Sequence, residues 1–193
     1  MTRDRIPIFP LHNLLLPHTD LGVHVFEEPY RALVRHSLGN GHSFGVVLVD
    51  SLVGTLARIG GYARLPDGRY LLELEGTKRF RIVDSHQNGS YPTARVEWLH
   101  EHIGNFADAR RAGDDVAALF QTYRMYRGDG DLPVQLPIDP VARSFVVASQ
   151  LRIDVENKQL LLECEAADER LEAEVAILHR EIEQLEELRS TRA

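Results

Sequence analysis

The chain has 193 residues, of which 44% are hydrophobic and 26% are charged, and these ordinary globular values exclude disordered, collagen-like and low-complexity proteins. No apolar run approaches the roughly 18 residues that a membrane helix needs, and the first residues do not read as a signal peptide. The single cysteine, Cys164, excludes an internal disulfide. We therefore expect a cytoplasmic protein of one domain, or one plus a small appendage, with no membrane partner.

The first half of the sequence predicts β structure. Short apolar or alternating runs are bounded there by turn residues, of which Pro66-Asp67-Gly68 is typical of a hairpin turn. Gly60-Gly61 predicts a bend inside a long strand. Residues 28–38 are the exception, because Pro29 fits the first turn of a helix. The six or seven expected strands suggest a small barrel or a curled sheet, and they cover residues 6–9, 22–27, 44–49, 53–65, 70–75, 79–83 and 93–99.

The second half predicts helices. The apolar period changes to 3.6 near residue 104, and Asp139-Pro140 is typical of a helix start. Expected helices cover residues 108–127, 139–151, 156–165 and 168–189. We therefore expect two lobes, a β lobe at 1–103 and a helical lobe at 104–193.

The last helix carries a heptad seam. We expect the first half of this seam to pack on the chain's own helices and the segment beyond Leu185 to project or fray. We expect the helix's many glutamates, Glu174 among them, on its flanks, where like charges oppose a parallel self-pair. We therefore expect the chain to be a monomer or a weak homo-oligomer. The seam residues are Leu171, Val175, Leu178, Ile182 and Leu185.

Charge is unevenly distributed along the chain. Residues 1–103 carry 11 basic and 11 acidic side chains, whereas residues 104–193 carry 11 basic and 18 acidic ones, which accounts for the whole net charge of −7. An acidic segment repels phosphate backbones, so nucleic acid is an unlikely partner for that end of the chain.

The order of several segments resembles the N-terminal domain of bacterial-type Lon proteases over nearly the whole chain. The segments that carry the resemblance are Ile6 to Leu11, Leu21 to Arg31, Phe44 to Leu48, Val53 to Ile59, Pro66 to Arg69, Gly76 to Ile82, Leu136 to Pro140, Lys158 to Glu163 and Arg170-Leu171. The resemblance implies an α+β fold, in which a PUA-like β-barrel or curled sheet with one helix precedes a helical bundle that ends in a long helix.

The resemblance also implies a function in binding. In Lon proteases this region takes part in substrate recognition and assembly, ahead of an ATPase and a protease domain. The present sequence contains no G-x-x-x-x-G-K-[ST] phosphate-binding motif and nothing like the family's catalytic serine motif. We therefore expect a non-catalytic polypeptide-binding module, with no cofactor, whose partners are polypeptide clients or a protease complex. An adaptor for unfolded or hydrophobic protein segments is the specific form of this hypothesis.

Leu14, Leu15, Leu16 and Pro17 form the candidate peptide-binding segment. This apolar run falls between two short strands, where a polar loop is expected. If it is partly exposed, it provides an apolar patch suited to an extended peptide. A core role fits the same residues, since the resembling family has apolar residues here as well.

A cryptic hydrolase or a metal enzyme is the alternative. Gly41 to Gly45 spells G-x-S-x-G around Ser43, but the expected helix precedes this motif and the strand follows it, which reverses the order that a nucleophile elbow needs. Histidines occur in two loose groups, and a closed zinc site needs further ligands. These histidines are His18, His24, His100 and His102.

RNA binding through the PUA-like lobe is a further alternative. Arg79 and Arg81 are expected on one face of a strand, with Phe80 and Ile82 on the other. The lobe has no net charge, and its basic residues do not alternate with aromatic ones. RNA binding therefore rests on analogy between folds.

Overall fold

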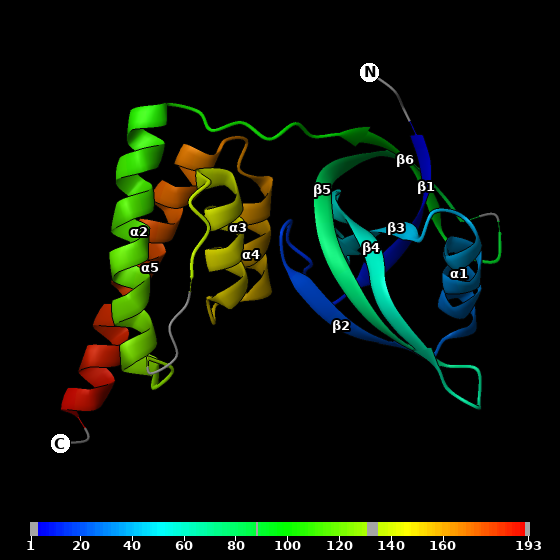
Figure 1. Cartoon of the computed structure of the whole chain (residues 1–193), viewed down its shortest axis with the longest axis horizontal. Helices are drawn as coiled ribbons and strands as arrows, with labels where there is room; N and C mark the ends of the chain where they lie inside the picture. The colour runs from blue at the N-terminus through cyan, green and yellow to red at the C-terminus, as the bar shows by residue number, and fades with distance from the viewer. Residues whose placement is uncertain (1–3, 88, 131–134, 192–193) are drawn as a thin grey trace. The chain divides into compact units, whose positions relative to one another are not determined.

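The computed structural model describes residues 4–87, 89–130 and 135–191 and has a mixed α+β architecture, as the sequence predicts (Figure 1). The chain divides into two compact units. The β unit comprises residues 1–100 and 153–162, and the helical unit comprises residues 101–152 and 163–193. Among the described residues, no helix combines the length and apolar character needed to cross a membrane.

The β unit is built on a six-stranded sheet with the order β2-β5-β4-β3-β1-β6. Strand β5 also pairs with β6, so five strands close into a barrel and β2 remains at an edge. Strands β1 and β3 run parallel, and the other pairs are antiparallel. The elements are β1 (Asp4–Leu11), β2 (Asp20–Val25), α1 (Glu28–Gly39), β3 (Ser43–Leu48), β4 (Val53–Arg64), β5 (Tyr70–His86) and β6 (Thr93–Trp98).

Strand β5 is one continuous strand where the sequence predicts two. It passes through Thr77-Lys78 without a break, because its first part pairs with β2 and β4 and its last part with β4 and β6. The expected bend in β4 is present as register shifts between Thr55 and Ala57 and between Ile59 and Gly61. Figure 1 shows the resulting curvature of β4 and β5.

The barrel interior is apolar and is covered at one end by α1. Pro29 lies at the start of this helix, and Leu33 and Val34 are buried against the sheet. The main cluster contains buried residues from the five strands β1 to β5, from α1 and from the segment before β2, which contributes Leu15. This packing fixes the positions of the ends of β1 and β2.

The segment 153–162 belongs to the β unit although it follows a helix of the other unit. It contains most of α4 (Val155–Glu163), and two side chains tie it to the barrel. Gln159 donates from Nε2 to the Val53 carbonyl at 3.2 Å, and Arg79 donates from Nη1 to the Leu162 carbonyl at 2.6 Å. Because Leu162 lies in the last turn of α4, the guanidinium satisfies a carbonyl at the negative end of the helix.

The helical unit contains α2 (Phe106–Arg127), α3 (Pro140–Gln150) and α5 (Ala167–Ser190). The Asn105 side chain accepts from the backbone at the start of α2, and the Asp139 side chain does so for α3, as expected for this residue before a proline. Helices α2 and α5 run side by side in the same direction. Arg111 reaches Glu172 at 3.0 Å near one end, and Tyr126 reaches Glu186 at 2.7 Å near the other.

Helix α5 confirms the apolar seam but differs from expectation at two points. Leu171 and Leu178 are fully buried. Glu174 is buried as well, because residues 170, 174 and 178 share a second buried stripe at helical spacing. The far end does not project freely, since Arg189 donates to the carbonyls of Met125 and Tyr126, at 3.3 and 2.9 Å.

Candidate functional site

An apolar hollow in the β unit is the candidate functional site. Its volume is about 290 Å³, and it is formed where β1 ends, where β2 passes into α1, and beside the turn after β3. We call it the apolar hollow, and its lining residues are Phe9, Pro10, Leu11, His12, His24, Val25, Phe26, Glu27, Tyr30 and Val49.

Aromatic rings form much of the wall of the apolar hollow. The rings of Phe9 and Tyr30 lie 4.6 Å apart between centroids, and those of His24 and Phe26 lie 5.9 Å apart. Phe9 is buried in the barrel core, whereas Phe26 is 60% exposed. The exposed ring extends the apolar surface of the hollow, and contiguous apolar surface is what marks interaction sites.

Polar groups stand at the rim of the apolar hollow. His12, His24 and Glu27 are exposed there. Burial raises the pKa of the Tyr30 hydroxyl, and the Glu27 charge raises it further, so this hydroxyl stays a neutral hydrogen-bond donor. The hollow therefore offers an apolar floor with a few groups that can hydrogen-bond to a peptide.

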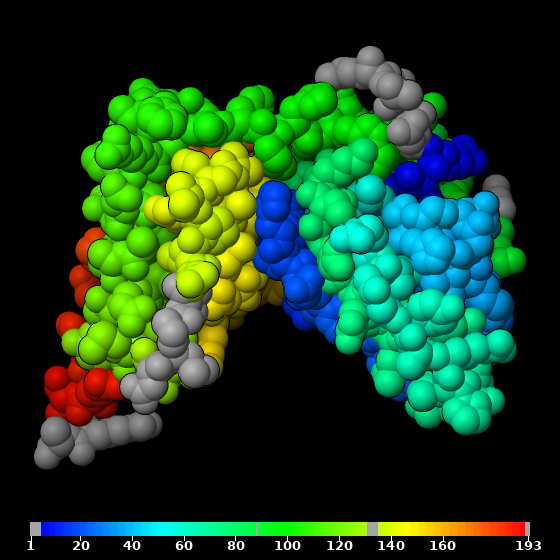
Figure 2. All heavy atoms as spheres, viewed as in Figure 1, coloured from blue at the N-terminus to red at the C-terminus, as the bar shows by residue number. Residues whose placement is uncertain are grey.

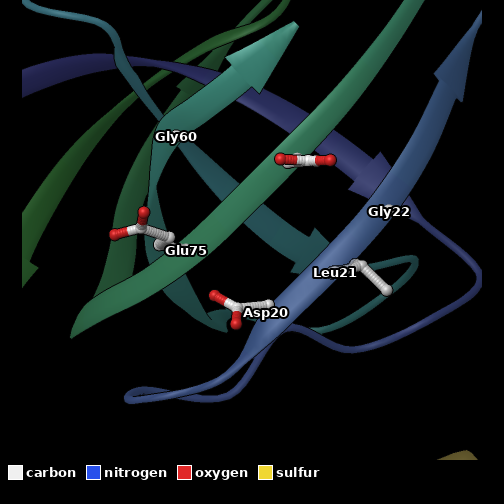
Figure 3. Close-up of a pocket in the computed structure, with 6 residues that line it drawn as sticks. Asp20, Leu21, Gly22, Gly60 and Glu75 are labelled. Carbon is white, nitrogen blue, oxygen red and sulfur yellow. The ribbon is translucent and has the colours of Figure 1, made fainter.

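A second hollow of about 330 Å³ lies at the other end of β2 and is acidic (Figure 3). Gly22 and Gly60 contribute no side chains to it. Arg58 forms an ion pair with Glu75, while Asp20 and Glu73 have no cationic partner among the described residues. We call it the acidic hollow, and its lining residues are Asp20, Leu21, Gly22, Gly60, Glu73 and Glu75.

The predicted peptide-binding segment lies in the loop between β1 and β2. Leu15, Leu16 and Pro17 are buried, and Leu14 is half-buried. None of these four residues lines the apolar hollow. Their role in peptide contact therefore stays a prediction, in which Leu14 is the side chain with surface to offer.

This loop is held against β5 by a close backbone approach. The Gly76 N–H donates to the Thr19 carbonyl at 2.8 Å, and the Gly76 carbonyl accepts from the His18 N–H at 2.9 Å. A Cβ on Gly76 would stand 2.0 Å from the Leu16 carbonyl oxygen. Only glycine fits here, and this contact fixes where β2 begins.

Ser43 begins β3 and follows α1, so the order of elements is the reverse of a nucleophile elbow. Its side chain is half-buried and makes no hydrogen bond with a histidine or a carboxylate among the described residues. The neighbouring His42 uses its backbone to bond Ser37 and Ile59.

The four candidate histidines do not form a metal site in the described part of the chain. There, no group of three or more histidine, cysteine, aspartate or glutamate side chains is placed to hold a metal ion. All four are exposed. The backbone of His102 bridges to Ala166 within the helical unit.

The two arginines of the RNA hypothesis differ in environment. Arg79 is 1% exposed and bonds the Leu162 carbonyl, whereas Arg81 is exposed. Phe80 lies in the barrel core with Ile82 packed against it, as the alternation predicts, but the Arg79 side chain bonds the end of α4 instead of reaching solvent and leaves only Arg81 exposed.

Sequence reasoning missed Phe26 and Tyr30, which the structure brings together with the end of β1. The signal was an aromatic residue near the end of the expected strand 22–27 and just before a helix start, at Phe26-Glu27-Glu28-Pro29. Its partner across the hollow, the end of β1, is fixed by the parallel pairing with β3, which the sequence does not reveal.

Comparison with known sequences gives one family over most of the chain. The family model of the ATP-dependent protease La (LON) substrate-binding domain matches residues 5–180. Among curated proteins, Lon protease 1 of Thermus thermophilus is 29% identical over 95% of this chain and 26% of its own length. The Lon protease of Escherichia coli K12 is 25% identical over 95% of this chain and 26% of its length. The chain thus spans about a quarter of the length of these two relatives.

Solved structures give the same fold. A Lon N-terminal domain protein from Xanthomonas campestris has a TM-score of 0.69 and 30% identity, over 90% of this chain and 98% of that one. The N-terminal domain of Mycobacterium avium complex Lon protease has a TM-score of 0.75, over 91% of this chain and 98% of that one. Its identity of 16% supports the fold alone.

Proposed function

Because the chain belongs to the family of Lon protease substrate-binding domains, we propose that it is a polypeptide-binding module that takes up apolar segments of its clients at the apolar hollow. The family is one of substrate recognition, not catalysis. We place the binding site at the apolar hollow because of Phe26, whose side chain lines the hollow and is 60% exposed. The energetic reason is that covering an exposed aromatic ring with an apolar client side chain removes both from water.

The size and chemistry of the apolar hollow suit one apolar side chain and the backbone around it. A volume of about 290 Å³ is at the lower end of the range for ligand pockets. The rim groups His12, His24 and Glu27 lie where they can bond peptide amides and carbonyls. Such a site favours unfolded or extended segments, because in folded proteins the apolar side chains are already buried.

The proposal also covers where the chain acts and which proteins it acts with. We propose that the chain acts without enzymatic chemistry of its own, in the cytoplasm, as an adaptor that delivers clients or joins a protease complex. The curated relatives that it resembles are named as Lon proteases, and it spans about a quarter of two of them. A pull-down with crosslinking from the native cell tests the partner directly.

Fluorescence anisotropy with a labelled peptide tests the site. The probe is a 12-residue fluorescein-labelled peptide with a central Leu-Phe pair flanked by lysine and serine, compared with the same peptide carrying Ser-Ser at its centre. We expect the Leu-Phe peptide to bind and the Ser-Ser peptide to bind at least tenfold more weakly. Phe26→Ser should weaken binding of the Leu-Phe peptide by a similar factor.

Phe106→Ser is the matched control. Phe106 is 65% exposed at the start of α2 in the helical unit, so it is a phenylalanine of similar exposure outside the site. We expect it to leave the affinity unchanged. If Phe106→Ser weakens binding and Phe26→Ser does not, the apolar hollow is the wrong site. If neither peptide binds, the polypeptide-binding function itself is wrong.

A further inference from the structure

Strand β2 has one edge without a strand partner. In the described part of the chain it pairs with β5 alone, and it stands at the end of the strand order outside the closed barrel. An edge strand presents a row of backbone N–H and C=O groups to which another extended chain can bond. The direction of each of these groups follows from the hydrogen-bond pattern of the sheet.

The hydrogen bonds at the start of β2 show which of its residues direct their backbone groups toward β5. The Gly76 N–H donates to the Thr19 carbonyl and the Gly76 carbonyl accepts from the His18 N–H, so Gly76 and the residues opposite it form a pair whose backbone groups point between β5 and the start of β2. In an antiparallel ladder such pairs alternate with pairs that point their backbone groups away. Leu21, Val23 and Val25 therefore face β5, and the groups that face the free edge belong to Asp20, Gly22 and His24.

The hydrogen bonds on the other side of β5, toward β4, assign the same residues of β5 to β2. The Leu65 N–H donates to the Arg69 carbonyl at the hairpin between β4 and β5. Alternation from this bond directs residues 71 and 73 of β5 toward β4 and leaves residues 70, 72 and 74 to β2. These three lie opposite Val25, Val23 and Leu21 in the register.

The free edge is accessible at its centre. Asp20, Gly22 and His24 are exposed, and a Cβ built on Gly22 meets no atom within 4 Å. Part of the blue segment that contains β2 lies at the molecular surface in Figure 2. Leu21 and Val23 pack on the barrel core, so β2 is held rigidly while its outer edge stays open.

We propose that the polypeptide ligand binds by adding a strand to the free edge of β2, bonding the backbone of Gly22 and His24. This inference rests on the proposed function and specifies how the client is held. At about 3.3 Å per residue, β2 from Asp20 to Val25 spans about 17 Å, so five to six client residues would cover it. Backbone bonding explains how one module accepts clients of different sequence, because amides are common to all of them.

The two ends of β2 define the chemistry of this client. His24 and Val25 also line the apolar hollow, so an apolar client side chain at that end enters it. At the other end, Asp20 and Glu73 are carboxylates without a cationic partner among the described residues. Charge complementarity therefore selects an extended client segment that carries an apolar residue and, four to six residues away, a lysine or arginine.

Gly22→Pro and Gly22→Ala test the strand addition with the lysine-flanked Leu-Phe peptide. Proline removes the outward N–H of residue 22 and leaves the bonds to β5 in place, since edge strands tolerate proline at such positions. Alanine keeps the N–H and finds open space for its methyl group. We expect Gly22→Pro to bind the peptide at least tenfold more weakly than Gly22→Ala, because the two variants differ in the outward N–H of residue 22.

Two measurements on the parent protein keep the test independent of how Gly22→Pro folds. Amide hydrogen exchange should slow at Gly22 and His24 when the peptide binds, with little change at Leu21 and Val23, which already bond β5. Peptides methylated on one backbone nitrogen at a time should lose affinity at alternate positions, because only every second amide faces β2.

Each outcome decides the proposal. Alternating sensitivity to methylation together with slower exchange at Gly22 and His24 supports it. Peptide binding that depends on Phe26 but leaves both amides unprotected and tolerates methylation at every position overturns strand addition, and the apolar hollow then remains the site. Equal affinity for lysine-flanked and glutamate-flanked peptides overturns the charge selection. Absence of any peptide binding overturns strand addition and the proposed function together.

Discussion

The two units of this chain use buried polar groups in different ways. In the β unit, the buried guanidinium of Arg79 bonds the last turn of α4, and Gln159 bonds the Val53 carbonyl. In the helical unit, Arg170 lies 3.8 Å from the centre of the Phe145 ring and donates to Ser144 Oγ at 2.8 Å. The same interior also buries Glu174, and neither of its carboxylate oxygens has a hydrogen-bond partner among the described residues.

Because of this difference, we assign ligand binding to the surface of the β unit and pH-dependent stability to the interior of the helical unit. The β unit uses its buried side-chain donors to bond backbone carbonyls, and it leaves polar backbone groups of β2 at an open edge. The helical unit buries in addition the carboxyl group of Glu174, which has no hydrogen-bond partner among the described residues and whose titration acts on folding. We therefore expect changes in the β unit's surface to alter ligand affinity and changes in the helical interior to alter the free energy of unfolding, with its pH dependence. Trp98 in β6, the chain's single tryptophan, reports on the β unit.

The largest effect is expected in the helical interior. Leu171→Ala and Leu178→Ala each remove a side chain that is fully buried. Each should lower the free energy of unfolding by about 2–5 kcal/mol, since the cavity adds to the lost burial. Denaturant titration followed by far-UV circular dichroism measures this. Leu188→Ala is the control, because Leu188 is 55% exposed on the same helix. Parent-like stability of both variants would show that the seam does not belong to the fold.

The next effect concerns the close backbone approach in the β unit. Gly76→Ala places a methyl group against the Leu16 carbonyl, so the loop before β2 must shift, at a cost of about 1–3 kcal/mol. Gly22→Ala, three pairs away along the same two strands, meets open space and should stay within about 0.5 kcal/mol of the parent. Unfolding followed by Trp98 fluorescence compares the two. Equal stabilities would show that the loop adapts freely.

The sequence predicted the classes of the elements better than their continuity. Helix starts such as Asp139-Pro140 were predicted correctly because capping is local chemistry. The single strand β5 was predicted as two, because a polar Thr77-Lys78 pair looks like a turn until β4 and β6 pair on either side of it. Phe26 could not be assigned to a hollow, since part of that hollow's lining comes from the end of β1, which is placed by a parallel pairing with β3 that local sequence does not encode.

Buried charge was the other feature that the sequence did not reveal. Glutamates are solvated on most helices, so the pattern placed Glu174 on a flank. Arg79 was expected to share one face of its strand with Arg81, and nothing in that pattern revealed its burial. In both cases the environment is set by residues far away in the sequence, at Leu162 for Arg79 and at the interior of the helical unit for Glu174.

Glu174 should make the helical unit less stable as the pH rises. Burial raises the pKa of this carboxyl well above its ordinary 4.5, and the Arg170 charge offsets only part of that rise. A raised folded-state pKa contributes stability that is fully present below pH 4.5 and is lost as the pH rises through the folded value. The free energy of unfolding should therefore fall by up to about 1.4 kcal/mol per pH unit from this group between pH 4.5 and its folded-state pKa.

Glu174→Gln isolates that contribution, since it keeps the shape and cannot ionise. Its unfolding, followed by circular dichroism between pH 5 and 8, should lack the part of the slope that the parent owes to Glu174. Glu183→Gln, on an exposed position of the same helix, should keep the parent's slope. A parent-like slope in Glu174→Gln would mean that the carboxyl is ionised in the folded protein and has a partner that the structure does not describe.

The smallest effect is expected at the end of α5 and concerns local order more than global stability. Arg189 donates to the carbonyls of Met125 and Tyr126 and lies 4.8 Å from the centre of the Tyr126 ring. These carbonyls lie in the last turn of α2, where the Gly128 N–H already reaches the Met125 carbonyl at 3.2 Å, and the guanidinium adds further donors to this end of the helix. All of these groups are exposed, so Arg189→Ala should cost less than about 1 kcal/mol in the free energy of unfolding.

The local effect of Arg189→Ala should be clearer, because the last turn of α5 loses its contact with α2. Hydrogen exchange should become faster over residues 186–190 and stay unchanged around Leu171. Arg180→Ala, on an exposed position of the same helix, should change neither. Unchanged exchange in Arg189→Ala would show that Tyr126 and Glu186 alone hold this end, and Tyr126→Phe in the same background would then release it.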